Sequence, residues 1–405
     1  MKKMRVHLFR LKHMVFLLMV ILVSPAINAC HDAKQKLSPP EPFKIGVMIR
    51  HFNHAGRSVP VMIWYPASPA PSAKAFDYYG SVEGRAVLEA PSDSSHGSYP
   101  LIIFSTGFSG CGMTSVFLTE HLAGLGYVVA APDFKDAFIC SVEHGRVSDR
   151  YFISILGNSP QGGKARFKEV YALLKTQECW TYRTKAISAT IDYLLEENQR
   201  PGPLRGMVDP SSIGVAGHSL GGWDALALGG VEICCDQPGD VAQDRGAAEN
   251  GLAGLCTLDL YRGKVTSLRD PRVKAVLALS SSVWAFPNNR GEAAVKIPTM
   301  IINGHRMDAK IEDVKDTYDH LPPPRYELIL KGVDHMTVSD LIRKMVLVRL
   351  VFIFSSGYIF HYPEKQEIFM NYSGNFFNAY LKNDPAGREY IQAAHYKRVL
   401  LRAEE

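Results

Sequence analysis

Three residues of the chain are of the types that together perform nucleophilic hydrolysis: Ser219, Asp308 and His335. A serine hydroxyl is nearly inert at neutral pH and needs a general base within hydrogen-bond reach. That base is usually a histidine, which a carboxylate holds in the correct tautomer and stabilises when it is charged. The hypothesis to test against the rest of the chain is therefore a serine nucleophile with a histidine base and an aspartate partner.

The residues around Ser219 predict a strand, a sharp turn and a helix. Apolar and small residues from Ile213 lead into Gly217-His-Ser-Leu-Gly221, and an alanine- and leucine-rich run follows. Glycines on both sides of the serine allow a tight strand-to-helix turn in which a Cβ atom would collide. The serine would then lie at the positive N-terminal end of the new helix. Taken alone, the same motif also fits a buried structural serine.

Asp308 and His335 each follow a predicted strand. Residues 298–303 and 326–330 are short apolar runs, and each of the two polar residues comes shortly after one of them. The carboxyl ends of parallel strands share one edge of a sheet, so residues beyond different strands meet there. The chain order Ser, Asp, His is the order of the α/β-hydrolase arrangement. We therefore predict a triad of Ser219, Asp308 and His335.

Each partner also has a simpler interpretation. Asp308 fits a helix N-cap and His335 fits a loop histidine at the surface, while Asp313 and Asp334 are the alternative acids. Of these two acids, Asp334 is the weaker choice because it is adjacent to the histidine. His218, His305 and His320 lack the H-x-x-x-H spacing of a metal site, so neither a metal nor an organic cofactor is expected.

An oxyanion hole is expected beside the serine. Its donors should be the amide of Leu220, which follows the nucleophile, and an amide from the loop after the strand at 101–105. We choose Phe108 for the second donor, because Gly107 permits the turn that aims its amide.

The flanking sequence predicts the fold that would hold these groups. Apolar runs typical of strands buried on both faces alternate with helical periodicity, as in a mostly parallel α/β sheet with helices on both faces. Residues 43–405 are assigned to one α/β-hydrolase domain with insertions at 134–180 and 230–270 as candidate lid or rim segments. The apolar run at 345–360 is expected to be a buried helix, with a substrate- or lipid-facing surface as the alternative.

The N-terminus has the features of an export signal. Basic residues precede ten apolar residues, and residues 1–30 end in Ile-Asn-Ala-Cys, which resembles a lipoprotein signal with Cys30 as the lipidated residue. Simple cleavage after Ala29 and a retained anchor are the alternatives. Residues 31–42 are expected to form a linker. We expect an exported protein, either periplasmic, anchored to the outer membrane as a lipoprotein, or secreted.

Composition excludes some partners and suggests disulfides. The net charge of +5 is small, and no basic stripe with interleaved aromatic residues points to nucleic acid. Apart from Cys30, six cysteines remain, an even number that suggests structural disulfides in an oxidising compartment. Their spacing does not determine how they pair.

Two segments resemble a known group of enzymes. Pro100-Leu-Ile-Ile-Phe-Ser-Thr-Gly-Phe-Ser109 and Asp209-Pro-Ser-Ser-Ile-Gly-Val-Ala-Gly-His-Ser-Leu-Gly-Gly222 are similar to platelet-activating-factor acetylhydrolases, dienelactone-hydrolase-like serine esterases and cutinase-like polyester hydrolases. The resemblance covers most of residues 43–340 and the terminal helix around residues 376–381, and it supports Asp308, His335 and Phe108 in the roles given above. Thr106 replaces a histidine common in these relatives, and true dienelactone hydrolases use a cysteine nucleophile.

The resemblance implies a serine carboxylic-ester hydrolase that forms an acyl-enzyme. Short-acyl, lipid-like or lactone esters are the expected small-molecule substrates. The alternatives are an acyltransferase or peptidase on the same triad, or a non-catalytic surface lipoprotein. The acyl group is not predicted, since both insertions fall outside the recognised segments.

Overall fold

The structure of the protein is a computed structural model. The described residues belong to one compact unit that spans residues 40–405. The structure describes residues 41–405, except for 70–72, 81, 83, 147–171, 173–175, 177, 244–253, 282, 284–285, 307–310 and 341–361. The predicted export signal at 1–30, with Cys30, and the apolar run at 345–360 therefore lie outside the described residues.

A ten-stranded, mostly parallel sheet forms the centre of this unit, in the order β14-β13-β12-β11-β8-β4-β5-β2-β1-β3. The parallel strands are β4 (Tyr99–Ser105), β5 (Val128–Pro132), β8 (Val208–His218), β11 (Val273–Leu279), β12 (Thr299–Arg306) and β13 (Arg325–Asp334). The flanking strands are β1 (Lys44–His54), β2 (Arg57–Ala67) and β14 (Val399–Glu404), which pair antiparallel, and β3 (Val87–Leu88), which is parallel to β1.

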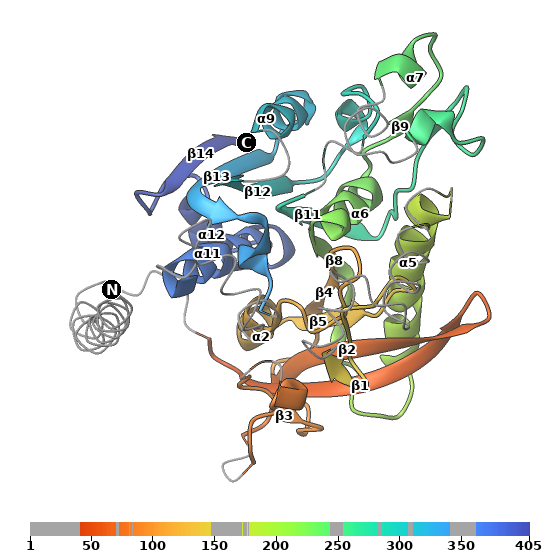
Figure 1. Ribbon diagram of the computed structural model, residues 1–405. Coiled ribbons are helices and arrows are strands. Elements are labelled where there is room, and N and C mark those ends of the chain that lie inside the picture. The colour runs from red at the N-terminus through yellow and green to blue at the C-terminus, as the bar shows by residue number, and fades with distance from the viewer. Residues whose placement is uncertain are drawn as a thin grey trace, which may run out of the picture. The chain divides into compact units, whose positions relative to one another are not determined.

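Helices cover both faces of the sheet, as Figure 1 shows. One face carries α5 (Cys179–Glu197), α6 (Leu220–Gly229) and α9 (Ile311–His320), and the other carries α2 (Val116–Gly124) and α11 (Tyr362–Leu381), which α12 (Pro385–Tyr390) follows. Successive strand residues point to opposite faces. In β4, accordingly, Leu101 and Ile103 belong to the core beneath α5 and α6, whereas Ile102 and Phe104 belong to the core beneath α2 and α11. The apolar runs predicted as two-sided strands are confirmed.

Both insertions contain only short elements among their described residues. The first includes the hairpin β6 (Cys140–Ser141) and β7 (Gly145–Arg146). The second includes β9 (Ile233–Cys234), α7 (Asp240–Gln243) and β10 (Val265–Thr266). Its two ends meet where the Asp270 amide donates to the Leu228 carbonyl at 3.1 Å. The remaining short 3₁₀ turns are Tyr78–Gly80, Leu255–Thr257, Glu292–Ala294 and His335–Val338.

Two disulfides are present in the described part of the chain. Cys111 pairs with Cys140, and Cys235 pairs with Cys256. Cys234 is buried and unpaired, so the expectation drawn from an even number of cysteines does not hold for it. None of the helices in the described segments is long and apolar enough to cross a membrane.

Candidate active site

Ser219 lies at the turn between β8 and α6. Its backbone has φ 58° and ψ −119°, a conformation that residues with a side chain rarely adopt. Close packing enforces the turn: a Cβ on Gly217 would lie 2.0 Å from the Gly221 carbonyl oxygen, and one on Gly221 would lie 2.0 Å from the Ser105 carbonyl oxygen. The Ser219 amide also donates to the Leu279 carbonyl of β11 at 2.9 Å. The sequence interpretation of a strained strand-to-helix turn is confirmed.

The loop after β4 lies against the serine. A Cβ on Gly107 would lie 3.3 Å from Ser219 Cβ and 3.2 Å from His218 Nδ1, so this glycine keeps the approach open. Phe108 and Ser219 are both half-buried. Leu220 is the first residue of α6, where backbone N–H groups have no partner within the helix. Among the described residues, neither the Phe108 amide nor the Leu220 amide has a hydrogen-bond acceptor, and both donors are available to a ligand.

His335 directly follows β13 and lies beside His218, the residue before Ser219. The rings of His218 and His335 have centroids 4.8 Å apart, and His218 Nε2 lies 2.9 Å from the His335 carbonyl oxygen. Burial, with the proximity of His335, lowers the pKa of His218 to about 3. His218 is therefore neutral at pH 7 and donates through Nε2–H to that carbonyl. The structure thus brings His335 to the turn that carries Ser219.

The two strands before the expected acid and base are longer than the apolar runs predicted. The run at 298–303 continues to Arg306 and the run at 326–330 continues to Asp334, because Arg306 and Asp334 still pair across the two strands. A Cβ on Gly304 would lie 2.3 Å from the Val333 carbonyl oxygen, which shows how closely the extensions pack. Asp308 itself lies outside the described residues, two positions after this paired end.

Asp334 serves a structural purpose. Its side chain accepts the Met336 amide at 3.0 Å and the Thr337 hydroxyl at 3.3 Å, which caps the short turn that begins at His335. Burial raises the pKa of this carboxyl above its usual value.

His320 is exposed, with Nδ1 2.8 Å from the Asp316 carbonyl oxygen. In the part of the chain that the structure describes, no group of three or more His, Cys, Asp or Glu side chains could hold a metal ion.

Sequence reasoning missed a buried cluster behind the Gly107 loop. The Arg183 side chain is fully buried and forms ion pairs with Asp136 at 2.8 Å and Asp224 at 3.2 Å. Burial raises the pKa of Asp136, but Arg183 and hydrogen bonds outweigh burial and lower it overall. Burial raises the pKa of Asp224 to about 6, and the charge of Asp136 adds to the rise, although Arg183 and the Ser105 hydroxyl act in the opposite direction. A signal was available: Arg183 precedes Ile187 by one helical turn and so occupies the apolar face of α5.

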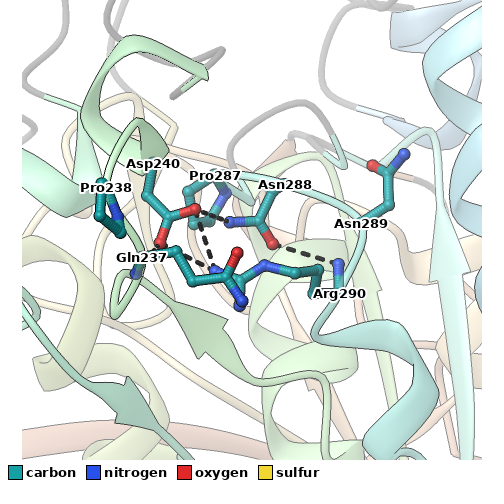
Figure 2. A pocket seen from close by; sticks show the side chains of 7 residues that line it. All are labelled: Gln237, Pro238, Asp240, Pro287, Asn288, Asn289 and Arg290. Atoms are coloured by element: carbon teal, nitrogen blue, oxygen red, sulfur yellow. Dashed lines mark hydrogen bonds and ion pairs between the residues drawn. The ribbon is translucent and has the colours of Figure 1, made fainter.

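A pocket of about 430 Å³ opens in a different place. It is lined by Gln237, Pro238, Asp240, Pro287, Asn288, Asn289 and Arg290. Its polar groups bind one another: Arg290 pairs with Asp240 at 2.8 Å, and the Arg290 amide donates to the Asn288 side-chain oxygen at 3.1 Å (Figure 2). None of its lining residues belongs to the turn at Ser219, the Gly107 loop or the His335 turn, so this pocket is not the candidate active site.

Comparison with known proteins agrees with this architecture. The family described as platelet-activating factor acetylhydrolase, isoform II, matches residues 72–357, which is more than half of the chain. No curated protein sequence matches. Among solved structures, a ferulic acid esterase from Streptomyces cinnamoneus is similar with a TM-score of 0.60 and 19% identity, over 91% of this chain and 99% of that one. This likeness shows the α/β-hydrolase fold.

Proposed function

Since the chain belongs to the platelet-activating factor acetylhydrolase isoform II family of carboxylic ester hydrolases, we propose that it hydrolyses short-acyl, lipid-like or lactone esters through Ser219. One observation carries the proposal: Ser219 is held at φ 58° on a tight turn, the Phe108 and Leu220 amides have no acceptor among the described residues, and the His335 ring lies beside that of the neighbouring His218. A structural serine would need neither the strained backbone nor the unused donors.

In the proposed reaction, Ser219 Oγ attacks the acyl carbon while His335 takes the hydroxyl proton. The Phe108 and Leu220 amides donate to the oxyanion of the tetrahedral intermediate. His335 then returns the proton to the leaving alcohol, which leaves an acyl-enzyme. Water, deprotonated by His335, hydrolyses the acyl-enzyme to a carboxylic acid and restores the serine. Asp308 orients His335 and stabilises its charged form.

The nucleophile is tested by labelling with a fluorophosphonate probe. The wild type should label with one probe per chain and hydrolyse an acetyl ester, whereas Ser219→Ala should lose labelling and on the order of 10⁶ in kcat. Ser211→Ala is the matched control, because Ser211 is an exposed serine of the same strand. Equal labelling of wild type and Ser219→Ala would refute the assignment. An unlabelled wild type would favour the non-catalytic lipoprotein.

The acid is tested by comparing two aspartates of the same segment. Asp308→Asn should lower kcat by about 10⁴, as expected when a triad histidine loses the carboxylate that sets its tautomer. Asp313→Asn should leave kcat within about threefold of wild type, since a change that does not touch the reacting groups has a small effect. The reverse pattern would transfer the role to Asp313.

Substrate class is tested with a panel of acetyl, butyryl and octanoyl esters, an acetyl phospholipid, a feruloyl ester and a lactone. The family's description names an acetylhydrolase of platelet-activating factor, and the similar structure is named for ferulic acid. Activity restricted to long acyl chains would contradict the short-acyl proposal. Amide substrates test the peptidase alternative, and added alcohol acceptors test the acyltransferase alternative.

We also propose that the protein is exported through residues 1–30 and anchored through a lipid on Cys30. Two disulfides among the described residues support an oxidising destination. Cell fractionation with metabolic palmitate labelling of wild type and Cys30→Ser tests both steps. Label retained by Cys30→Ser would contradict lipidation, and a wild type found only in the cytosol would contradict export.

A further inference from the structure

We propose that Arg183 is a positioning residue that fixes the oxyanion loop, residues 106–110, in the geometry that ester hydrolysis requires. The inference rests on the function proposed above, since it concerns the same site. Arg183 does not touch the reacting atoms. It acts through the backbone that carries the Phe108 amide.

Arg183 holds the two carbonyls that precede this amide. From α5, its Nη1 donates to the Thr106 carbonyl at 2.7 Å and its Nη2 donates to the Gly107 carbonyl at 3.1 Å. In a trans peptide the C=O and the next N–H point in opposite directions. Fixing the Gly107 carbonyl toward Arg183 therefore turns the Phe108 N–H away from α5, and the Gly110 amide secures the same carbonyl at 3.0 Å.

The two carboxylates paired with Arg183 hold Ser109 of the loop and Ser105 at the strand end before it. Asp136 accepts the Ser109 amide at 3.0 Å, and Ser109 adopts φ 64°, a conformation that needs outside support. Asp224 accepts the Ser105 hydroxyl at 2.8 Å. The cluster thus binds four of the five residues that run from Ser105 to Ser109, and the fifth is Phe108, whose amide has no acceptor in the part of the chain that the structure describes. The hydrogen-bonded residues are Ser105, Thr106, Gly107 and Ser109.

Burying this charged cluster in the core costs desolvation free energy. Arg183, Asp136 and Asp224 are each at least 99% buried, and removing charges from water costs more than packing apolar groups of the same size. Apolar residues would stabilise the fold equally well but could not hold two carbonyls and an amide of one loop. Oxyanion donors stabilise the transition state only when they are already in place before charge develops.

The test uses Arg183→Lys, Arg183→Met and the control Arg272→Met. Arg272 also joins α5 to a neighbouring loop, through Asp192 on the helix and Asp270, but its contacts do not include the oxyanion loop. Fluorophosphonate titration counts the competent Ser219 sites in each preparation. For each variant we would measure kcat per titrated site, KM for an acetyl ester and Ki for a trifluoromethyl ketone. The ketone forms a hemiketal on the serine whose oxyanion occupies the same donors.

Losing one oxyanion donor costs about 10² to 10³ in rate, and a loosened donor should cost less. We therefore expect both Arg183 variants to lose about 10- to 100-fold in kcat per titrated site, with KM within about threefold of wild type. Ki for the ketone should rise by the factor by which kcat/KM falls. Lysine should retain more activity than methionine because it keeps one cationic donor toward the carbonyls. Arg272→Met should match wild type per titrated site.

Both Arg183 variants could have fewer titrated sites but the same kcat and Ki per site as wild type. That result would overturn the proposal and leave Arg183 a purely structural residue. If Arg183→Met fails to fold, Arg183→Lys decides alone by the same criterion. A wild type that neither labels nor hydrolyses the ester would instead refute the proposed function. The two failures are therefore distinguishable.

Discussion

Replacing His218 by glutamine should remove part of the acid sensitivity of the fold. The His218 side chain is 4% exposed, and burial beside His335 lowers its pKa to about 3 from a reference value of 6.5. The unfolded chain therefore binds a proton at this position below about pH 6.5, whereas the folded protein does not until about pH 3. Stability is lost as the pH falls through that window and is fully present above it.

The size of the effect follows from linkage. One pH unit within the window corresponds to about 1.4 kcal/mol, so the loss between pH 6.5 and pH 5 is about 2 kcal/mol. Glutamine does not titrate, and its amide can still donate to the His335 carbonyl. On going from about pH 7.5 to pH 5, the wild type should therefore lose about 2 kcal/mol more unfolding free energy than His218→Gln.

Urea denaturation followed by circular dichroism at both pH values measures this difference. His320→Gln is the control, because it also exchanges a histidine for glutamine but at an exposed position. Equal pH dependence in wild type and His218→Gln would refute the conclusion that the buried ring is neutral. His218→Leu removes the hydrogen bond to His335 as well, so its kcat should fall below that of His218→Gln.

Three further outcomes follow from the described contacts. Gly107→Ala places a methyl group 3.3 Å from Ser219 Cβ and should lower kcat by about tenfold at nearly unchanged melting temperature, as measured by steady-state kinetics and calorimetry; unchanged kcat would contradict the close approach. Cys111→Ser/Cys140→Ser opens a crosslink between residues 29 apart and should cost about 3 kcal/mol in urea unfolding, and a cost below about 1 kcal/mol would contradict a stabilising role. Asp224 has a pKa raised to about 6, so the wild type should gain stability relative to Asp224→Asn as the pH falls from 6 toward 3.8; a relative loss in that window would contradict the raised pKa.

Much of the fold was predictable because its signals are local. Strands buried on both faces give continuous apolar runs, and the glycines around Ser219 mark a turn whose close contacts admit no side chain. The two strands were predicted to end too early, at residues 303 and 330. They end at Arg306 and Asp334, because backbone pairing continues after each apolar run stops. Strand β14 was not predicted, because only Val399 of this edge strand is buried and its other residues are half-buried or exposed.

Residues of the candidate site could be predicted only where the residue type and its neighbours in the sequence indicate a single role. The serine in its turn and the histidine after a strand could be named from their neighbours. The contribution of Arg183 could not, because its carboxylate partners lie 47 and 41 residues away and no periodicity encodes such pairs. The spacing of His218 argued only against a metal site, and the folded chain shows that it is buried with its Nε2 2.9 Å from the His335 carbonyl oxygen.

The hydrogen bond between Asp270 and Leu228 has a consequence for how this chain can diverge. It closes the second insertion at its base, so the segment leaves α6 and returns to β11 at nearly the same point. The Cys235–Cys256 disulfide closes the segment a second time from within. Ser219 is fixed from the other side, by β8 and by the Leu279 carbonyl. The ends of residues 231–269 therefore stay together whatever the length of chain between Cys235 and Cys256, so we expect a change of length there to leave the nucleophile in place.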